Sequence, residues 1–204
     1  ETNSGREDLK RLVVASKNQG KVEEIRHVLD MSNIEIRSLE DYQQVPDVVE
    51  NGITYLENAL KKAKAYSNFT GEAVLADDSG LEVDFLNGEP GIHSARYAGP
   101  DATDEENYRK LLQSITGVAP EKRGARFRCV LVLYHPDGHY ESFEGVWHGV
   151  IHTNPIGDQG FGYDPVFYLP DRGVTVAQLA PETKNTLSHR AQALFLFKEW
   201  LRSH

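Results

Sequence analysis

The hydrophobic period of the chain changes twice before residue 40, and this change restricts the fold more than any other feature. A short apolar run at 11–16, rich in β-branched residues, predicts a strand, and the polar stretch after it predicts a loop. From Val22 to Leu29 the apolar residues recur at spacings of three and four, which predicts a helix. The alternation at 34–39 predicts a second strand. Strand, loop, helix and strand in this order indicate an α/β fold.

The rest of the chain continues the alternation of helices and strands. Thr54 and Glu57 form a capping-box pattern that starts a second helix, and further strands follow, the first of which is expected to end in the segment 77–80. No repeat or linker interrupts the pattern, so a single domain is expected over 11–204, after a polar tail at 1–10. The expected helices lie at about 54–69, 104–115 and 187–202, and the expected strands at 73–76, 81–85, 126–134 and 139–151.

Composition and charge exclude several classes of protein. The 204 residues suffice for one large domain or two merged lobes, and 22 basic against 31 acidic residues leave a net charge of −9. This acidity argues against a nucleic-acid partner, although a few lysines in a cleft would still bind a small anion. Cys129 is the single cysteine, and no apolar run reaches the roughly 18 to 20 residues that span a bilayer. We expect a cytosolic protein without a membrane partner.

The loop between the first strand and the first helix is a candidate anion site. Backbone N–H groups and the helix dipole favour an anion at such a position, and the loop adds two lysines, a hydroxyl and amides. Its spacing is not that of a Walker A motif, and an ordinary solvated turn is the alternative. The candidate residues are Ser16, Lys17, Asn18, Gln19, Gly20 and Lys21.

Paired carboxylates at Asp77 and Asp78 form a second candidate site. Adjacent carboxylates repel each other unless a cation or hydrogen bonds compensate them, and Mg²⁺ prefers one or two carboxylates together with waters and phosphate oxygens. Glu50 is a further candidate ligand, and an acidic turn is the alternative. Neighbouring side chains on a strand point to opposite faces, so a strand continuing through both aspartates would give them different roles.

Two later segments carry groups suited to a flat, polar ligand. In the glycine-rich stretch at 160–165, Phe161 or Tyr163 would stack on a base and Asp164 would accept a ring N–H, unless the loop only packs on the core. Basic side chains stand before and at the start of the last helix, where they oppose the helix dipole. This unfavourable placement favours a functional role for Lys184, His189 and Arg190 as donors to carbonyl or phosphate oxygens.

Six ordered blocks of this sequence resemble the inosine triphosphate pyrophosphatase family, which acts on non-canonical purine nucleotides. Only about the first ten residues lie outside the resemblance, and Ser16 stands where the family often has Thr, another hydroxyl. The blocks are 15–21, 57–59 with 62–63, 76–81, 90–97, 160–165 and 188–190.

The resemblance implies a fold, a reaction and a set of roles. The fold would be α/β, with an elongated mixed central sheet and flanking helices in two lobes around a nucleotide cleft, in a homodimer. The reaction would be the Mg²⁺-dependent hydrolysis of ITP, dITP and XTP to the monophosphate and pyrophosphate. Carried over by position, Glu50 and Asp78 would hold the metal, and Asp78 would be the general base with Asp77 beside it. The implied substrate-binding residues are Ser16, Lys17, Asn18, Gln19, Gly20, Lys21, Lys62, Ser79, Phe161, Gly162, Tyr163, Asp164, Lys184, His189 and Arg190.

Three alternatives to this reaction stay open at the level of sequence. A related pyrophosphatase would use the same phosphate chemistry on modified pyrimidine or methylated nucleotides. A non-catalytic sensor would bind the nucleotide without hydrolysis, but a pure binder gains nothing from the carboxylates at Asp77, Asp78 and Glu50 unless metal is bound. A nucleic-acid-binding module is disfavoured by the net charge of −9.

Overall fold

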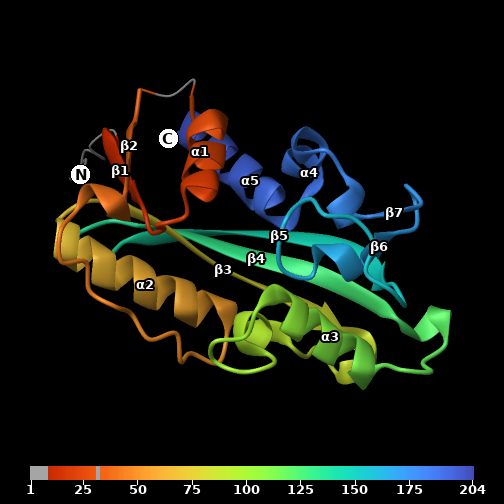
Figure 1. Ribbon diagram of the computed structural model, residues 1–204. Coiled ribbons are helices and arrows are strands. Elements are labelled where there is room, and N and C mark those ends of the chain that lie inside the picture. Colours follow the sequence, from red (N-terminus) through yellow and green to blue (C-terminus); the bar gives the residue numbers. More distant parts are fainter. Residues whose placement is uncertain (1–8, 31–32) are drawn as a thin grey trace.

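A single seven-stranded sheet runs through the molecule. The computed structural model describes residues 9–30 and 33–204, so most of the predicted tail at 1–10 lies outside the described residues (Figure 1). The spatial order of the strands is β2-β1-β3-β4-β5-β6-β7. Their bounds are β1 (Arg11–Val14), β2 (Glu35–Ser38), β3 (Val74–Val83), β4 (Gly124–Tyr134), β5 (Tyr140–Ile151), β6 (Phe167–Leu169) and β7 (Val174–Thr175).

The sheet is mixed, which agrees with the predicted fold class. β1 pairs in parallel with β2 and with β3, as the opening strand, helix and strand pattern requires. From β3 onward the pairing is antiparallel, and β3, β4 and β5 form a long central ribbon of 10, 11 and 12 residues. This ribbon extends well past the end of β1, which is four residues long.

Helices cover both faces of the sheet (Figure 1). One face packs on α1 and α5, and Phe197 of α5 is fully buried there, which stabilises the fold by about 2 to 3 kcal/mol. The other face packs on α2. Among the described residues, no helix combines the length and the apolar character that crossing a membrane requires. The helix bounds are α1 (Gln19–Val28), α2 (Tyr55–Thr70), α3 (Asp104–Ser114), α4 (Pro181–Leu187) and α5 (His189–Ser203).

The start of α2 follows the predicted capping pattern with one change. Thr54 is the N-cap, and its hydroxyl accepts a hydrogen bond from the N–H of Glu57 at 3.1 Å. The carboxylate of Glu57 reaches one residue further back than a capping box requires and accepts the N–H of Ile53 at 2.8 Å. The chain before α2 is therefore held against the helix by side chains of its first turn.

The prediction that one strand ends in the segment 77–80 and another runs over 81–85 is wrong. β3 is one strand from Val74 to Val83, in unbroken register with β4 from Val74↔Tyr134 to Val83↔Ala125. A segment with two aspartates and a glycine has the composition of a turn, but here the antiparallel partner satisfies its backbone and distant side chains satisfy its charges.

The C-terminal region also differs from the predicted pattern. The helix expected at 187–202 is α5, which begins at His189, and the shorter helix α4 precedes it. Ser188 separates the two helices in an extended conformation and caps α5 by accepting the N–H of Ala191 at 3.0 Å. The short strands β6 and β7 were not predicted, because two or three residues carry no readable period.

Close packing of α5 on β5 yields a stability prediction at Gly145. A Cβ there would overlap the carbonyl of His189 and lie 2.9 Å from Cβ of Gln192. We expect Gly145→Ala to lower the free energy of unfolding in urea by about 3 kcal/mol, because the helix must move away. The control Gly117→Ala, at φ +77° with nothing within 4 Å, should cost only about 1 kcal/mol. Equal losses in the two variants would contradict this account of the packing.

Candidate active site

The candidate site lies along an edge of β3 that β1 leaves open. β1 pairs with β3 only at Val13↔Val74 and Val14↔Leu75. The carbonyl of Leu75 still accepts the N–H of Ala15, whereas the carbonyl of Asp77, two residues further on and pointing to the same side, accepts Lys62 Nζ at 2.5 Å. Because ligands of α/β sheets bind beyond the carboxyl ends of strands, this is where a ligand is expected.

Asp77 faces the helices α1 and α5. Its carboxylate accepts Lys21 Nζ at 2.6 Å, and Arg190 Nη2 lies 3.6 Å from it. Burial by itself would raise the pKa of Asp77, but Lys21, Arg190 and Lys62 together outweigh burial and hold that pKa well below its usual range. Asp77 is therefore an ionised carboxylate set among cations.

Asp78 faces α2 on the other side of the sheet. Its carboxylate accepts the side-chain amide of Asn58 at 3.1 Å and the backbone N–H of Ser79 at 3.1 Å. Burial raises the pKa of Asp78 to about 6, against the pull of Lys62 and of the Asn58 hydrogen bond. The continuous strand thus separates the two aspartates onto opposite faces, although both flank the same open edge.

Helix α2 carries cations and amides toward this edge. Lys62 Nζ lies 2.8 Å from the Glu50 carboxylate, so one ammonium links the Glu50 loop to β3. The nearby negative charge of Glu50 contributes to the raised pKa of Asp78. Among the described residues, no three His, Cys, Asp or Glu side chains gather in a way that would hold a metal ion. Mg²⁺ needs only one or two carboxylates when it also takes phosphate oxygens and water. The carboxylates of Glu50 and Asp78 therefore fit that ion.

The loop at 16–21 folds back on itself at the start of α1. Asn18 is the N-cap: its side chain accepts the N–H of Lys21 at 3.2 Å, and its own N–H donates to the hydroxyl of Ser16 at 3.0 Å. The side-chain amide of Gln19 contacts the Glu40 carboxylate, and Lys17 is exposed. This arrangement presents the N-terminus of α1 and Lys21 beside Asp77, as an anion site requires.

The predicted base-binding segments meet at the other end of the open edge. Asp164 is 4% exposed, and its carboxylate accepts Lys184 Nζ at 2.7 Å and the N–H of Phe161 at 3.0 Å. Gly160, at φ +73°, lies so close to Asp164 that a Cβ would overlap its carboxylate. The Phe161 ring is 57% exposed, with Lys184 Nζ 4.3 Å from its centroid, so this ring is free to stack on a ligand.

His189 and Arg190 open α5 between the two clusters. The His189 ring stacks on Phe127 with 4.9 Å between centroids, and Arg190 lies between Asp77 and the Phe161 ring, 5.8 Å from its centroid. Within the described part of the chain, His189 Nδ1 and Arg190 Nε are buried without a hydrogen-bond partner. Buried polar atoms normally find partners, so both side chains keep capacity for one further hydrogen bond at this site.

Tyr163 occupies a different place from the other aromatic residue of its loop. It is 5% exposed, and its hydroxyl donates to the carbonyl of Ser94 at 2.6 Å. It anchors the loop, and Phe161 carries the free ring. Gly162 is held from the other side, because its N–H donates to the exposed Asp104 carboxylate at 2.9 Å.

Two of these supporting residues received no role from the sequence. Asn58 lies four residues before Lys62, a spacing that puts both on one side of a helix, and this spacing was the available signal. Asp104 gave no signal, because nothing in the sequence relates it to residue 162, which is 58 positions away.

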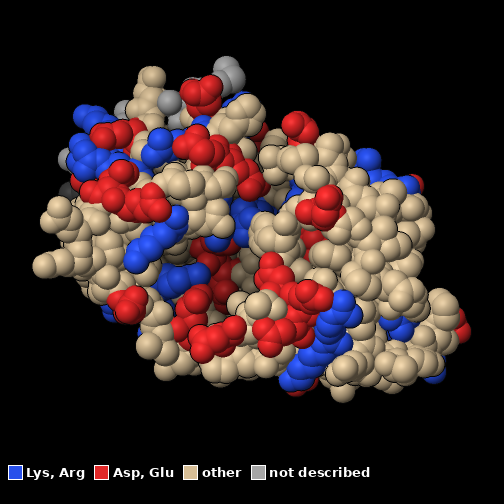
Figure 2. All heavy atoms as spheres, viewed as in Figure 1, with Lys and Arg blue, Asp and Glu red and all other residues tan. Residues whose placement is uncertain are grey.

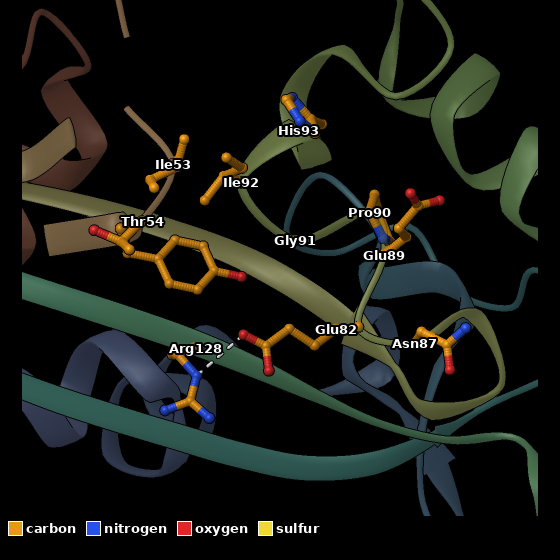
Figure 3. A pocket seen from close by; sticks show the side chains of 12 residues that line it. Ile53, Thr54, Glu82, Asn87, Glu89, Pro90, Gly91, Ile92, His93 and Arg128 are labelled. Atoms are coloured by element: carbon orange, nitrogen blue, oxygen red, sulfur yellow. Dashed lines mark hydrogen bonds and ion pairs between the residues drawn. The ribbon is translucent and has the colours of Figure 1, made fainter. Parts of the chain in front are cut away.

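The surface around this edge is hollowed and highly charged. Figure 2 shows acidic and basic side chains around and inside a hollow in the middle of one face. A neighbouring groove of about 470 Å³ continues along the Asp78 face of β3, and Glu82 and Arg128 line it (Figure 3). Arg128 Nε lies 3.1 Å from the Glu82 carboxylate. This groove is lined by none of the predicted site residues.

Cations and carboxylates on an open strand edge, beside an aromatic loop, define an α/β protein built to bind a phosphorylated ligand. The chain belongs to the Ham1 family, whose family model matches residues 12–200. The predicted resemblance is thereby confirmed. A dITP/XTP pyrophosphatase of Geobacter sulfurreducens is 50% identical over 191 residues, which cover 94% of this chain and 96% of that protein. One of Geobacillus kaustophilus is 50% identical over 193 residues, covering 94% and 95%.

Solved structures agree with the fold. A HAM1 protein from Coxiella burnetii matches with a TM-score of 0.91 and 39% identity, over 96% of this chain and all of that one (100%). The Staphylococcus aureus Ham1 protein matches with a TM-score of 0.88 and 41% identity, over 95% and 99%. The predicted α/β architecture with a mixed central sheet is confirmed.

The burial of His189 yields a prediction on its protonation. Burial, together with Arg190 and Lys184, lowers the pKa of His189 to about 3. We expect its ring resonances in NMR spectra to stay unchanged between about pH 5 and 8, and to titrate near 6.5 once the chain is unfolded in urea. Because the folded pKa is the lower one, the stability contributed by neutral His189 is present above about pH 6.5 and is lost as the pH falls.

Assignment of the ring resonances would rest on their absence from His189→Gln. A His189 resonance of the folded protein that moved with a midpoint near 6.5 would contradict the neutral ring.

Proposed function

We propose that this chain is a dITP/XTP pyrophosphatase, which hydrolyses ITP, dITP and XTP to the monophosphate and pyrophosphate and so removes them from the nucleotide pool. The observation that carries the proposal is that Asp78 lies next to a cluster of cations on the same open edge of β3, where Lys21, Lys62 and Arg190 contact the neighbouring Asp77. The names of the relatives that are 50% identical over nearly the whole chain support the same reaction.

The phosphate chemistry follows from this arrangement of charges. Water attacks the α-phosphorus, the bond from that phosphorus to the bridging oxygen breaks, and pyrophosphate leaves. Lys21, Lys62 and the first N–H groups of α1 neutralise the triphosphate and its leaving group. Asp78 orients the water and accepts its proton. Ser79 lies beside both aspartates, where its hydroxyl contacts the substrate.

Asp77 has a separate role in this scheme. It lies on the face opposite Asp78 and already pairs with Lys21 and Arg190, so it holds the phosphate-binding cations rather than a second water or the metal. Glu50 and Asp78 would hold Mg²⁺, which neutralises charge on the phosphate oxygens when it is bound.

The base is selected by donors at the aromatic loop. A 6-oxo purine accepts hydrogen bonds where adenine presents an amino donor, so Lys184 or Arg190 would stay unpaired against ATP. The uncharged His189 ring and the exposed Phe161 ring complete the pocket, the latter by stacking on the base. Asp164 accepts a ring N–H while it positions Lys184.

We also infer a homodimer working in the cytosol without a nucleic-acid partner. The resemblance to the inosine triphosphate pyrophosphatase family supports the dimer, and the net charge of −9 supports the absence of a nucleic-acid partner.

The reaction is tested by pyrophosphate release from ITP, XTP, dITP, GTP, ATP and CTP. We expect release from ITP, XTP and dITP in Mg²⁺, none in EDTA, and a loss of about a thousandfold in Asp78→Asn, because the base and a metal ligand are removed together. The folded state of the variant is checked by its thermal unfolding. Binding of ITP without release would make the chain a sensor, and release mainly from GTP, ATP or CTP would overturn the base assignment.

Base selection is tested separately at Lys184. We expect Lys184→Ala to lower the ratio of kcat/KM for ITP over ATP by about tenfold or more, because a donor to the 6-oxo group is lost. Lys110→Ala is a matched control, since Lys110 Nζ lies 4.2 Å from the centroid of an aromatic ring, that of Tyr97, at another place. An unchanged ITP-to-ATP ratio in Lys184→Ala would remove that residue from the selection of the base.

A further inference from the structure

Both the oxygen and the nitrogen of the Asn58 side-chain amide make hydrogen bonds. It is 1% exposed in the first part of α2. Its Oδ1 accepts the N–H of Gly52 at 2.8 Å, and its Nδ2 donates to Asp78 Oδ2 at 3.1 Å. One buried amide thus joins the loop that carries Glu50 to the carboxylate of Asp78.

The rest of this loop is held by neighbouring side chains of α2. Lys62 pairs with Glu50 at 2.8 Å, Lys61 donates to Asn51 at 2.5 Å, and Glu57 accepts the N–H of Ile53 at 2.8 Å. The segment 50–53 is therefore bound residue by residue to the first two turns of the helix. Of these four side chains of α2, Asn58 also donates a hydrogen bond to the Asp78 carboxylate on β3.

We propose that Asn58 is a positioning residue for the hydrolysis, which holds the Asp78 carboxylate and the Glu50 loop at a fixed separation and orientation. This inference rests on the proposed function. A carboxylate that must orient a water is effective only in a narrow range of positions, and a displacement of about 1 Å can cost a factor of 100 in rate. Glu50 and Asp78 carry like charges. They need such a fixed support, because their repulsion would otherwise drive them apart.

The orientation of Asp78 follows from its two hydrogen bonds. Asn58 holds Oδ2, and the backbone N–H of Ser79 holds Oδ1. A carboxylate has about four lone-pair sites, so each oxygen keeps capacity for a water or a metal ion after these bonds are made. The two donors fix the plane of the carboxylate without using up its acceptors.

Gly52 shows that the loop must approach Asn58 closely. A Cβ at this position would lie 2.8 Å from Asn58 Oδ1 and 2.8 Å from Cβ of Glu57. Gly52→Ala therefore pushes on the amide of Asn58 from the side opposite Asp78, which offers a second way to disturb the same bridge.

A matched control exists in another helix. Asn107 occupies the same position of α3, four residues after its N-cap, and is 3% exposed. Its Oδ1 accepts the N–H of Ala98 at 2.8 Å, and its Nδ2 donates to the carbonyl of Ala95 at 3.1 Å. It has the burial and bonding of Asn58 but no carboxylate partner, so it reports what the loss of a purely structural amide costs.

The test compares Asn58→Asp with Asn107→Asp in steady-state XTP hydrolysis and in thermal unfolding. Asn58→Asp keeps the acceptor for Gly52 but loses the donor to Asp78. We expect its kcat to fall by about tenfold or more with KM for XTP within about twofold, and its half-saturating Mg²⁺ concentration to rise. Asn107→Asp should lower Tm by a similar amount and leave kcat within about twofold. Equal kcat in the two variants at similar Tm would overturn the proposal.

Two further measurements keep the result independent of turnover. The Asn58 side-chain amide resonances, assigned by their absence from Asn58→Asp, should shift in Asp78→Asn, whereas those of Asn107 should not. Gly52→Ala should lower kcat in the same direction as Asn58→Asp. Unmoved Asn58 resonances, or unchanged kcat in Gly52→Ala, would contradict the bridge. Wild-type protein that releases no pyrophosphate from any nucleotide would refute the proposed function instead, with the bridge still visible in the spectra.

Discussion

A buried carboxylate is tolerated only where opposite charges surround it, and this requirement organises the centre of the molecule. Asp77 is met by Lys21 from α1 and by Arg190 from α5, while Lys62 from α2 bonds its main-chain carbonyl. Helices on both faces of the sheet are thereby tied to one residue of β3. The cations are held in place before any phosphate arrives, so little reorganisation is needed when it binds.

The open edge of β3 lets the two faces of a sheet serve one ligand. Asp77 and Asp78 point in opposite directions, and in the middle of a sheet their surroundings would be separated by neighbouring strands. Here β1 ends after pairing with Leu75, so groups from α1 and α5 above and from α2 below reach the same stretch of strand. The cations that contact Asp77 and the amide that holds Asp78 therefore come from different faces of the sheet to neighbouring residues of one strand.

Periodicity predicted α1, α2, α3 and the β4–β5 hairpin because each of them buries one face, and burial leaves a repeat in the sequence. It failed at 77–80, where charge and glycine suggested a turn, because the partners that make a strand acceptable there come from distant segments. Local residue chemistry supplied most of the candidate site residues, and the resemblance added Lys62, Ser79 and Gly162. Neither could supply the face of each aspartate or the bond from Asn58, which depend on three-dimensional packing.

The unbroken register of β3 has a consequence for how chains of this kind can change in length. Loops around the sheet can gain or lose residues at small cost, because their ends stay close together. The ten residues of β3 cannot, since each step of one residue turns every following side chain to the other face. A single insertion in β3 ahead of Asp77 would turn the carboxylate that contacts Lys21 and Arg190 toward α2, and the carboxylate that Asn58 holds toward α5. Related sequences are therefore expected to tolerate substitutions in this strand far more often than insertions or deletions.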